Sequence, residues 1–325
     1  MKTIVRMFVA STLIWTAGLL PATAQKYPQR PVKIIVPFPA GGATDVITRA
    51  IGERVAKLLG QPWIIENRPG ANGAIGLSSC ATSAPDGYTF CLLTADQLTI
   101  MPFYNPDLFN RYSTLVPTTL LVRAPGIIYA GNHVKARDMK EFAQLETSAR
   151  GSLNYASFGV GSPPQIFFEW LNKSHNLSIQ HIPFKGSNDA LSEIISGRVD
   201  ASYVALGFIV EQIKAGTLKG LAVLGDRRAP LLPEVPTLAE LGFEYPLKGT
   251  WFGLGAPNGT SQEIMDVIAA AIRATVHASD FREKFLDPSG YTPVGSSSAE
   301  FVEVVRVETV RGKEIIDITG LKAQP

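Results

Sequence analysis

A glycine-rich turn between two regular elements is the part of this sequence best suited to binding chemistry. Residues 34–45 read Ile-Ile-Val-Pro-Phe-Pro-Ala-Gly-Gly-Ala-Thr-Asp, an apolar strand pattern that enters a turn and then a helical pattern. The free N–H groups and the positive dipole end of a helix N-terminus attract anions, and Gly41 and Gly42 allow a ligand to approach the backbone closely. The same pattern is typical of a βα turn that only packs, so both interpretations stay open for this first turn (residues 37–45) alone.

Two later turns have the same form. The second turn, residues 155–164, follows another strand pattern and reads Tyr-Ala-Ser-Phe-Gly-Val-Gly-Ser-Pro-Pro, with Ser162 placed as an N-cap and Pro163 at the first helical position. The third turn, residues 184–188, reads Phe-Lys-Gly-Ser-Asn and precedes a further helical pattern. Because ligands of open α/β sheets bind beyond the carboxyl ends of strands, we expect the first and second turns to face one cleft and to bind a carboxylate.

Residue groupings that would indicate an enzyme do not occur in the sequence. It contains no Gly-x-Ser-x-Gly elbow, Walker loop, His-Glu-x-x-His or Cys-x-x-Cys motif. The four histidines, His133, His175, His181 and His277, lie outside the turns assigned to the cleft. The sequence therefore predicts a binding protein without catalytic residues, metal site or cofactor, and a hydrolase is the disfavoured alternative.

The two cysteines, Cys80 and Cys91, flank a turn that reads Ala-Pro-Asp-Gly-Tyr at residues 84–88. An exported chain meets an oxidising compartment, which favours a local disulfide. A helix-to-strand geometry can, however, hold the two Cα atoms too far apart. A disulfide and two buried thiols therefore both remain expectations.

The first residues have the composition of an export signal. Lys2 and Arg6 precede an apolar run at residues 7–20, and Ala-Thr-Ala at residues 22–24 forms a small-x-small cleavage site. Residues 1–24 are thus predicted to be a signal peptide that is cleaved near Ala24. An N-terminal membrane anchor is the alternative, which the shortness of the run disfavours.

The composition is that of a globular protein. Hydrophobic residues make up 46% of the 325 residues and charged residues 18%, which predicts a sizeable core rather than disorder. The formal net charge is +2, with no basic cluster and no acidic tail. We therefore expect no nucleic-acid partner and no attraction to an anionic membrane.

Short apolar runs alternate with helical periodicity along most of the chain, which predicts an α/β fold with largely parallel sheets. Helix starts are indicated at Asp138, Thr260 and Ser297, each followed three residues later by a glutamate. Loop-like compositions at residues 101–117 and 227–236 are expected to be crossings between two lobes. Strands are expected at residues 32–36, 63–66, 88–93, 127–130, 153–156, 179–182, 201–204, 221–224 and 252–254.

Taken together, these segments resemble the Bug family, the substrate-binding proteins of tripartite tricarboxylate transporters. The resemblance covers essentially the whole mature chain, although Gln165 stands where the family often has histidine. It rests on the first and second turns and on the segments Glu-Asn-Arg-Pro-Gly-Ala-Asn-Gly at 66–73, Ala-Pro-Asp-Gly-Tyr-Thr at 84–89, Pro-Phe-Lys-Gly at 183–186 and Leu-Pro-Glu-Val-Pro-Thr at 232–237.

The resemblance implies a type II periplasmic-binding-protein fold, with two α/β lobes, two crossings and a ligand cleft between the lobes. Lobe 1 is expected at residues 25–125 and 247–325, and lobe 2 at residues 126–246. The resemblance also implies a monomeric periplasmic solute-binding protein that captures a small organic acid and delivers it to integral-membrane transporter subunits. A sensor subunit that presents the same ligand to a signalling receptor is the alternative.

By position in the family, backbone amides and small side chains of the first and second turns hold the ligand carboxylate. Since this carboxylate and Asp45 would repel each other, Asp45 is expected to cap its helix, to bind through water or to meet a ligand donor. Topology adds positions that follow a strand of each lobe, whereas Lys185 is as typical of a solvated surface. The predicted ligand-binding residues are Phe38, Ala40, Gly41, Gly42, Thr44, Asp45, Thr94, Asp96, Ser157, Gly159, Gly161, Ser162, Lys185 and Tyr203.

Overall fold

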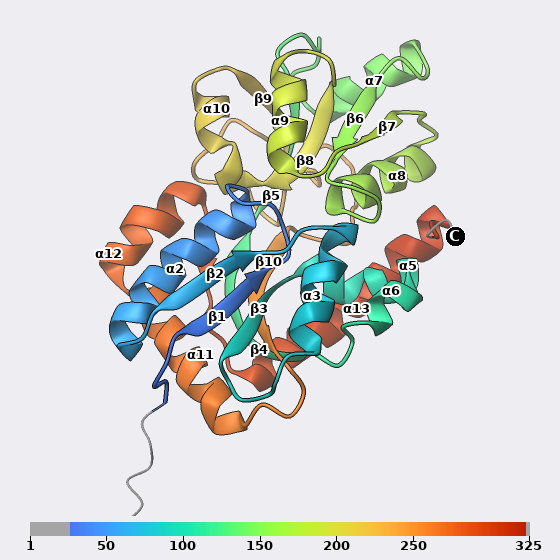
Figure 1. The fold of residues 1–325 in the computed structure, drawn as a ribbon. Coiled ribbons are helices and arrows are strands. Elements are labelled where there is room, and N and C mark those ends of the chain that lie inside the picture. Colours follow the sequence, from blue (N-terminus) through green and yellow to red (C-terminus); the bar gives the residue numbers. More distant parts are fainter. Residues whose placement is uncertain (1–26, 323–325) are drawn as a thin grey trace, which may run out of the picture.

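The structure, a computed structural model that describes residues 27–322, contains two separate β-sheets, each in a lobe of its own (Figure 1). The predicted signal peptide and its cleavage site lie outside the described residues. Lobe 1 contains a six-stranded sheet in the order β11-β4-β10-β3-β1-β2. Its strands are β1 (Val32–Val36), β2 (Trp63–Asn67), β3 (Thr89–Thr94), β4 (Val116–Ala124), β10 (Thr250–Ala256) and β11 (Thr292–Pro293).

Lobe 2 contains a five-stranded sheet in the order β7-β6-β8-β5-β9. Both sheets are mixed rather than largely parallel. β5, the first strand of lobe 2, and β10, the strand by which the chain returns to lobe 1, are antiparallel to their neighbours. The strands of lobe 2 are β5 (Gly126–Gly131), β6 (Asn154–Ser157), β7 (Gln180–Pro183), β8 (Ala201–Ala205) and β9 (Leu218–Leu224).

Two segments cross between the lobes. β4 leads into β5 through Pro125, while residues 225–249 lead from β9 back to β10. The predicted crossing at 227–236 belongs to this return segment but itself packs on lobe 2, where Leu232 and Val235 join the core. The prediction of a crossing at residues 101–117 is wrong. This segment holds two short helices, α5 (Met101–Tyr104) and α6 (Pro106–Asn110), and the start of β4.

Prolines explain why this region reads as a loop in the sequence. Pro117 interrupts the pattern of β4, but it pairs with Gly255 at an irregularity of the ladder, a position where a strand tolerates proline. In α6, Pro106 occupies the first helical position, and the side chain of Asn105 accepts a hydrogen bond from the N–H of Leu108 at 3.0 Å. Each proline therefore lies where its missing N–H costs little.

Capping residues mark several helix starts. Asp138 and Ser297 cap their helices as predicted, whereas Ser261 rather than Thr260 caps the helix that follows it. Among residues 27–322, none of the helices combines the length and the apolar character of a membrane span. The remaining helices are α2 (Ala43–Leu59), α3 (Ala74–Ala81), α4 (Ala95–Thr99), α7 (Met139–Ser148), α8 (Pro163–His175), α9 (Ser187–Ile195), α10 (Val210–Lys214), α11 (Gln262–His277), α12 (Ser279–Phe281) and α13 (Ser298–Thr319).

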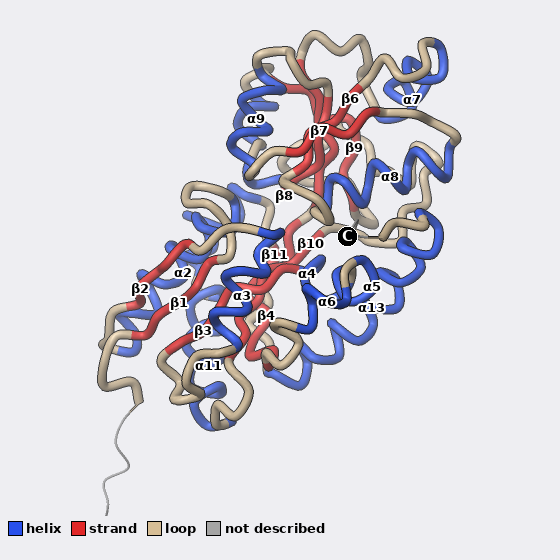
Figure 2. The backbone as a smooth tube through the Cα atoms, turned by 45° about the vertical axis from the view of Figure 1, so that its right-hand side comes forward, coloured by secondary structure: helices blue, strands red, loops and turns tan. Residues whose placement is uncertain are grey.

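The C-terminal helix α13 packs against both lobes (Figure 2). Near its start, Phe301 meets Trp251 of lobe 1 edge-on, with ring centroids 5.0 Å apart. Near its end, Ile315 shares a hydrophobic core with Met101 and with Phe167 of α8. Apolar packing thus joins the two lobes along one side, and we expect any relative motion of the lobes to pivot about that side.

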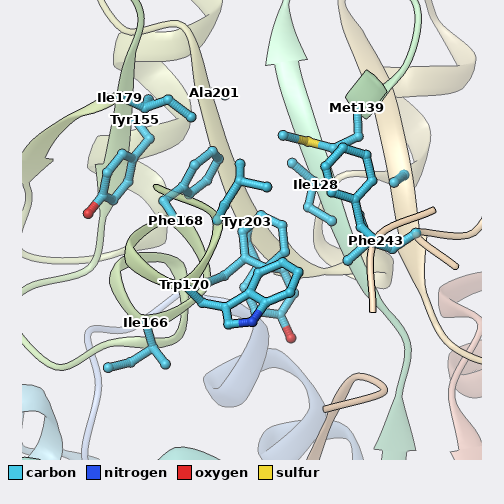
Figure 3. Packing of buried hydrophobic residues seen from close by; sticks show 14 of the residues in the cluster. Ile128, Met139, Tyr155, Ile166, Phe168, Trp170, Ile179, Ala201, Tyr203 and Phe243 are labelled. Carbon is cyan, nitrogen blue, oxygen red and sulfur yellow. The ribbon is translucent and has the colours of Figure 1, made fainter. Parts of the chain in front are cut away.

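An aromatic core in lobe 2 holds the second turn at both ends (Figure 3). Tyr155 of β6 stacks on Phe168 of α8, with ring centroids 4.4 Å apart and an interplanar angle of 12°. The hydroxyl of Tyr155 donates a hydrogen bond to Glu169 at 2.9 Å. Because β6 precedes the turn and α8 follows it, this packing fixes where the turn begins and ends.

Cys80 and Cys91 are free thiols buried in the core of lobe 1. The thiol of Cys91 donates a hydrogen bond to the carbonyl oxygen of Gly255 at 3.7 Å. Burial, together with the adjacent Cys80, raises the pKa of Cys91, which keeps the thiol protonated and weakly reactive. A disulfide between the two residues stays a prediction.

Candidate functional site

A cavity of about 310 Å³ lies between the lobes, where β1, β3 and β8 end and where α2 and α9 begin. Lobe 1 contributes Phe38, Pro39, Ala40, Gly42, Ala43, Thr44, Asn72, Thr94, Asp96, Thr250 and Phe252 to its lining, and lobe 2 contributes Phe158, Pro163, Gly186, Ser187, Asn188, Asp189, Tyr203, Val204 and Ala205.

A second and larger cavity, of about 670 Å³, lies along the crossing segments and α13. Charged groups of its lining already pair with one another, Arg123 with Glu308 at 3.0 Å and Lys248 with Asp226. None of the three turns contributes to it. The smaller cavity, at the carboxyl ends of strands from both lobes, is therefore the candidate site.

The first turn brings the start of α2 to this cavity. Gly42 is the N-cap residue, and it lines the cavity together with Ala43 and Thr44. The N–H groups of the first helical turn have no partner inside a helix, so this end of α2 can donate to an anion. A Cβ atom at Gly42 would lie 3.3 Å from the hydroxyl of Ser187 in lobe 2, so glycine keeps the gap between the lobes open at this point.

Asp45 shapes the first turn and does not line the cavity. Its carboxylate, only 3% exposed, accepts hydrogen bonds from the N–H of Gly41 at 2.9 Å and from Asn67 at 2.9 Å, and it pairs with Arg49 at 2.9 Å. Burial opposes ionisation, but the hydrogen bonds outweigh it and lower the pKa of Asp45. Gly41, with φ +79°, donates to Asp45 and likewise stays out of the lining.

The third turn brings the start of α9 to the same cavity from lobe 2. Gly186 is the N-cap residue of α9, and Ser187, Asn188 and Asp189 of its first turn line the cavity. The two lobes meet here, because a Cβ atom at Gly186 would lie 3.2 Å from the Pro39 side chain. The first and second turns face one cavity, as expected, but the second turn reaches it only through Phe158 and Pro163, and the third turn adds the start of α9. Lys185 is exposed and lies outside the lining.

The second turn uses its donors internally. The hydroxyl of Ser162 donates to the carbonyl of Gly159 at 2.6 Å, and the N–H of Gly159 donates to the hydroxyl of Ser157 at 3.2 Å. The N–H of Gly161 donates to the side-chain oxygen of Gln165 at 2.6 Å. Ser157, Gly159, Gly161 and Ser162 accordingly do not line the cavity, and the turn contributes only the apolar Phe158 and Pro163.

Prolines also weaken the start of α8 as an anion site. Pro163 and Pro164 occupy its first two positions, so two N–H donors that a helix normally presents are missing. Gly161, with φ +80°, packs so closely on α5 that a Cβ atom would lie 2.8 Å from the ring of Tyr104. The sequence signal, glycine and serine before a helix start, was correct for the local fold but did not reveal that its donors were already taken.

His181 completes the second turn, a role that the sequence did not indicate. Its Nε2 lies 2.6 Å from the hydroxyl of Ser157, and its ring stacks on Tyr155 with centroids 5.0 Å apart. Burial lowers the pKa of His181. Ser157 is fully buried and outside the lining, and no carboxylate among the described residues hydrogen-bonds to His181, so the pair orders the turn rather than forming a nucleophile and base.

Asp96 and Asn72 form a polar cluster at the end of β3. Asp96, in the first turn of α4 and only 6% exposed, accepts hydrogen bonds from the hydroxyl of Thr94 at 2.7 Å and from the Nδ2 of Asn72 at 3.1 Å. The same Nδ2 donates to the carbonyl of Gly161 in lobe 2 at 3.1 Å. Asn72 is therefore the residue that links Asp96 to the second turn across the two lobes.

Tyr203 lies within β8, the strand expected at residues 201–204, and it lines the cavity at the crossing. A Cβ atom at Gly126 would lie 2.3 Å from the Tyr203 ring, so the ring occupies the space that this glycine leaves. Burial, aided by the negative charge of Asp96, raises the pKa of Tyr203, so its hydroxyl keeps its proton at neutral pH.

Of the predicted residues, those that line the cavity are Phe38, Ala40, Gly42, Thr44, Thr94, Asp96 and Tyr203.

Comparison with known proteins identifies the family. A model of the family described as "Tripartite tricarboxylate transporter family receptor" matches residues 47–321. The chain belongs to this family. Protein BugT of Bordetella pertussis is 31% identical to it over 320 residues, which cover 97% of each chain.

Two solved structures show the same fold with ligands. MatC of Rhodopseudomonas palustris with bound malate is 31% identical and superposes with a TM-score of 0.82, over 89% of this chain and 100% of that one. A protein of R. palustris with adipate is 27% identical, with a TM-score of 0.86, over 91% and 99% of the two chains. The predicted Bug-family membership and two-lobed periplasmic-binding-protein fold are thus confirmed, and similar members of the family bind carboxylates.

Several lining residues were missed by reasoning from the sequence. Ser187 and Asn188 belong to the third turn, which carried the same glycine signal but was given less weight. Asn72 has φ +49° and precedes Gly73, which has φ +89°, and an Asn-Gly pair is a turn signal in the sequence. Thr250 and Phe252 reach the cavity from β10, and only the return crossing brings them there. Among residues 27–322, no group of three or more His, Cys, Asp or Glu side chains is placed to hold a metal ion.

Proposed function

We propose that this protein is a periplasmic solute-binding protein that captures a small organic acid between its lobes for a tripartite tricarboxylate-type transporter. The observation that carries the proposal is that α2 of lobe 1 and α9 of lobe 2 begin at the same cavity. Each helix start supplies free N–H donors and a partial positive charge. A carboxylate between them exchanges its water for two sets of oriented dipoles.

Binding would favour the closed arrangement of the lobes. A ligand stabilises one conformation only by as much as it binds that conformation better than the other. A carboxylate that accepts from both helix starts has its full set of donors only when Gly42 and Ser187 lie close, as they do here. The free energy of the ligand contacts is then the free energy that holds the lobes together.

The role that follows is capture and delivery without chemistry. The lining of the cavity offers no paired nucleophile and base, and the matching family is described as a transporter receptor. We propose that the chain is exported, that it begins near Gln25 after cleavage, and that it acts as a monomer docking transiently on integral-membrane subunits. A closed, ligand-loaded receptor presents a surface that differs from the open one, which lets the membrane subunits distinguish the two.

Thermal-shift measurements on residues 25–325 test the proposal. The protein is unfolded to remove copurified ligand, refolded and heated with organic acids and with the corresponding amides or methyl esters. A ligand that binds only the folded state raises Tm by mass action. We expect Tm to rise with one class of acids and not with their amides. If no acid raises Tm while a neutral compound does, the carboxylate site is refuted.

A further inference from the structure

The end of the cavity that contains Asp96 and Asn72 selects which acids can bind. This inference rests on the function proposed above. Asp96 is a buried carboxylate that lines the cavity and accepts hydrogen bonds only from neutral groups, among them Thr94 and Asn72. Within residues 27–322 it pairs with no Lys, Arg or His, and the lining of the cavity contains none of these residues. A buried negative charge that lacks a cationic partner is costly unless a ligand supplies the positive charge.

Asn72 gives a second, independent indication of missing donors. Its Nδ2 serves both Asp96 and the carbonyl of Gly161, at 3.1 Å each. Its Oδ1 is buried and accepts no hydrogen bond from the described residues. This end of the cavity therefore holds a buried acceptor that no donor among the described residues satisfies.

The topology sets the distance between the two ends. α2 follows β1 and Asp96 follows β3, and these are neighbouring parallel strands of lobe 1. Neighbouring strands lie roughly 5 Å apart, and both ends line the same cavity of about 310 Å³, which suits a short ligand. The rest of the lining is largely apolar and aromatic, including Phe38, Phe158 and Phe252.

We propose that the cavity binds a short amino acid, an acid with one carboxylate and one protonated amine, whose ammonium group binds Asp96 and Asn72. The carboxylate accepts from the starts of α2 and α9. The ammonium group has three donors and gives Asp96 the cationic partner that the described residues do not supply. The ligand carboxylate lies at the two helix starts, of which that of α9 also carries the exposed carboxylate of Asp189.

A dicarboxylate of similar length suits this cavity less well. Malate and adipate occupy two solved structures similar to this chain, but here a second carboxylate would lie beside Asp96 with no Lys or Arg in the lining. Like charges at such a separation repel strongly in a low dielectric. Burial raises the pKa of Asp96 against the effect of its hydrogen bonds, and a ligand ammonium group would offset that burial.

Isothermal titration of the refolded chain 25–325 against three matched series tests the inference. The first series carries one amine and one carboxylate and includes L-alanine, β-alanine and 4-aminobutanoate. The second replaces the amine by carboxylate, from malonate to glutarate with malate, and the third replaces it by methyl, from propanoate to pentanoate. We expect the tightest amine-bearing ligand to bind at least about tenfold more tightly than any dicarboxylate.

The variants Asp96→Asn and Asp266→Asn complete the test. Asp266 is an exposed residue of α11 far from the lining, so it controls for the loss of one negative charge. Asp96→Asn should lower the ratio of amine to dicarboxylate affinity by about tenfold or more, and Asp266→Asn should leave it within about twofold. A ratio of affinities is insensitive to partial misfolding of the variant. If Asp96→Asn does not fold, the order in which the unsubstituted protein binds the three ligand series still tests the proposal.

Each outcome has a distinct meaning. Tighter binding of dicarboxylates, with a ratio unchanged by Asp96→Asn, overturns the amino-acid proposal but leaves the carboxylate receptor standing. Preference for the methyl series does the same. If no member of any series binds, the amino-acid proposal is refuted, and the thermal-shift screen against other organic acids decides the carboxylate function separately.

Discussion

The first and second turns are built from the same sequence elements but differ in what they present to the cavity. Each follows a strand, contains glycines at positive φ and leads into a helix. In the first turn, Asp45 takes up one backbone N–H and leaves those of the following helical turn available. In the second turn, side chains within the turn and Gln165 take up the donors. The comparison teaches that a glycine-rich helix start can bind an anion only where neighbouring side chains do not already accept hydrogen bonds from its backbone N–H groups.

The largest effect is expected from filling the gap at the first turn. Gly42 has φ −76°, so valine is compatible with the backbone, but a Cβ atom would lie 3.3 Å from the Ser187 hydroxyl and the γ-methyl groups would reach further. Gly42→Val should lower ligand affinity by about a hundredfold, roughly 2.7 kcal/mol, because the lobes cannot close. Titration calorimetry with the best ligand of the thermal-shift screen measures this. Gly225→Val is the matched control, since a Cβ there meets only the Arg227 carbonyl, at 3.6 Å; equal losses in both variants would remove the first turn from the site.

Breaking the second turn should affect stability rather than affinity. Gln165→Ala leaves the N–H of Gly161 without its 2.6 Å partner in a buried turn. We expect unfolding in urea to become easier by about 2 kcal/mol, with affinity for the same ligand changed by less than about threefold. A large loss of affinity with unchanged stability would show that the second turn contacts the ligand after all.

The contact between the two regions is expected to have a smaller effect. Asn72→Gly keeps the positive φ of this position and removes the hydrogen bonds to Asp96 and to Gly161 across the lobes. Affinity should fall by about tenfold, because the closed arrangement loses a bond that the open one does not have. Small-angle scattering with saturating ligand should then show a more open average shape. An unchanged scattering profile and unchanged affinity would mean that Asn72 does not link closure to binding.

The smallest expected effects are two separate losses of stability on acidification. His181 in the second turn has a pKa lowered by burial from its ordinary value of 6.5, so the unfolded chain takes up a proton first and stability falls as pH drops below about 6.5. Asp45 in the first turn has a pKa lowered from 3.8, so its contribution is complete above that pH and is lost as pH falls through its folded value. Urea unfolding between about pH 2 and pH 8 measures both. His181→Gln should remove the loss of stability that begins below pH 6.5, and Asp45→Asn the loss that begins below pH 3.8. If either variant removed the loss of stability assigned to the other residue, the assignment would be contradicted.

The sequence predicted much of the local structure correctly because local patterns decide it. Helix caps at Asp138 and Ser297 were correct, as was the start of α8 at Pro163. The failures were at β4 and α6, where a proline that reads as a loop signal occupies a ladder irregularity or a first helical position. Such positions depend on a partner strand or on a cap, and a single segment does not reveal them.

The site was less predictable because it depends on contacts between distant segments. The hydrogen bond that Gly161 donates to Gln165 follows from helix geometry, and the one between His181 and Ser157 follows from the pairing of β6 with β7. Those contacts decide that the N–H donors of the second turn are satisfied and that α9, rather than α8, presents free donors beside α2 at the cavity. The residues Asn72 and Ser187 became visible as lining residues only through that arrangement.

The sequence by itself determined the family, the α/β character and the places where strands end and helices begin, because these follow from local propensity, capping and hydrophobic period. Tertiary structure alone decided which helix starts keep free donors, which carboxylate is buried without a cation and where the two lobes meet. The physical reason is that a donor, an acceptor or a charge is available to a ligand only if no neighbouring group already satisfies it. For Asp96, Asn72 and Ser157 those neighbours come from parts of the chain far apart in sequence.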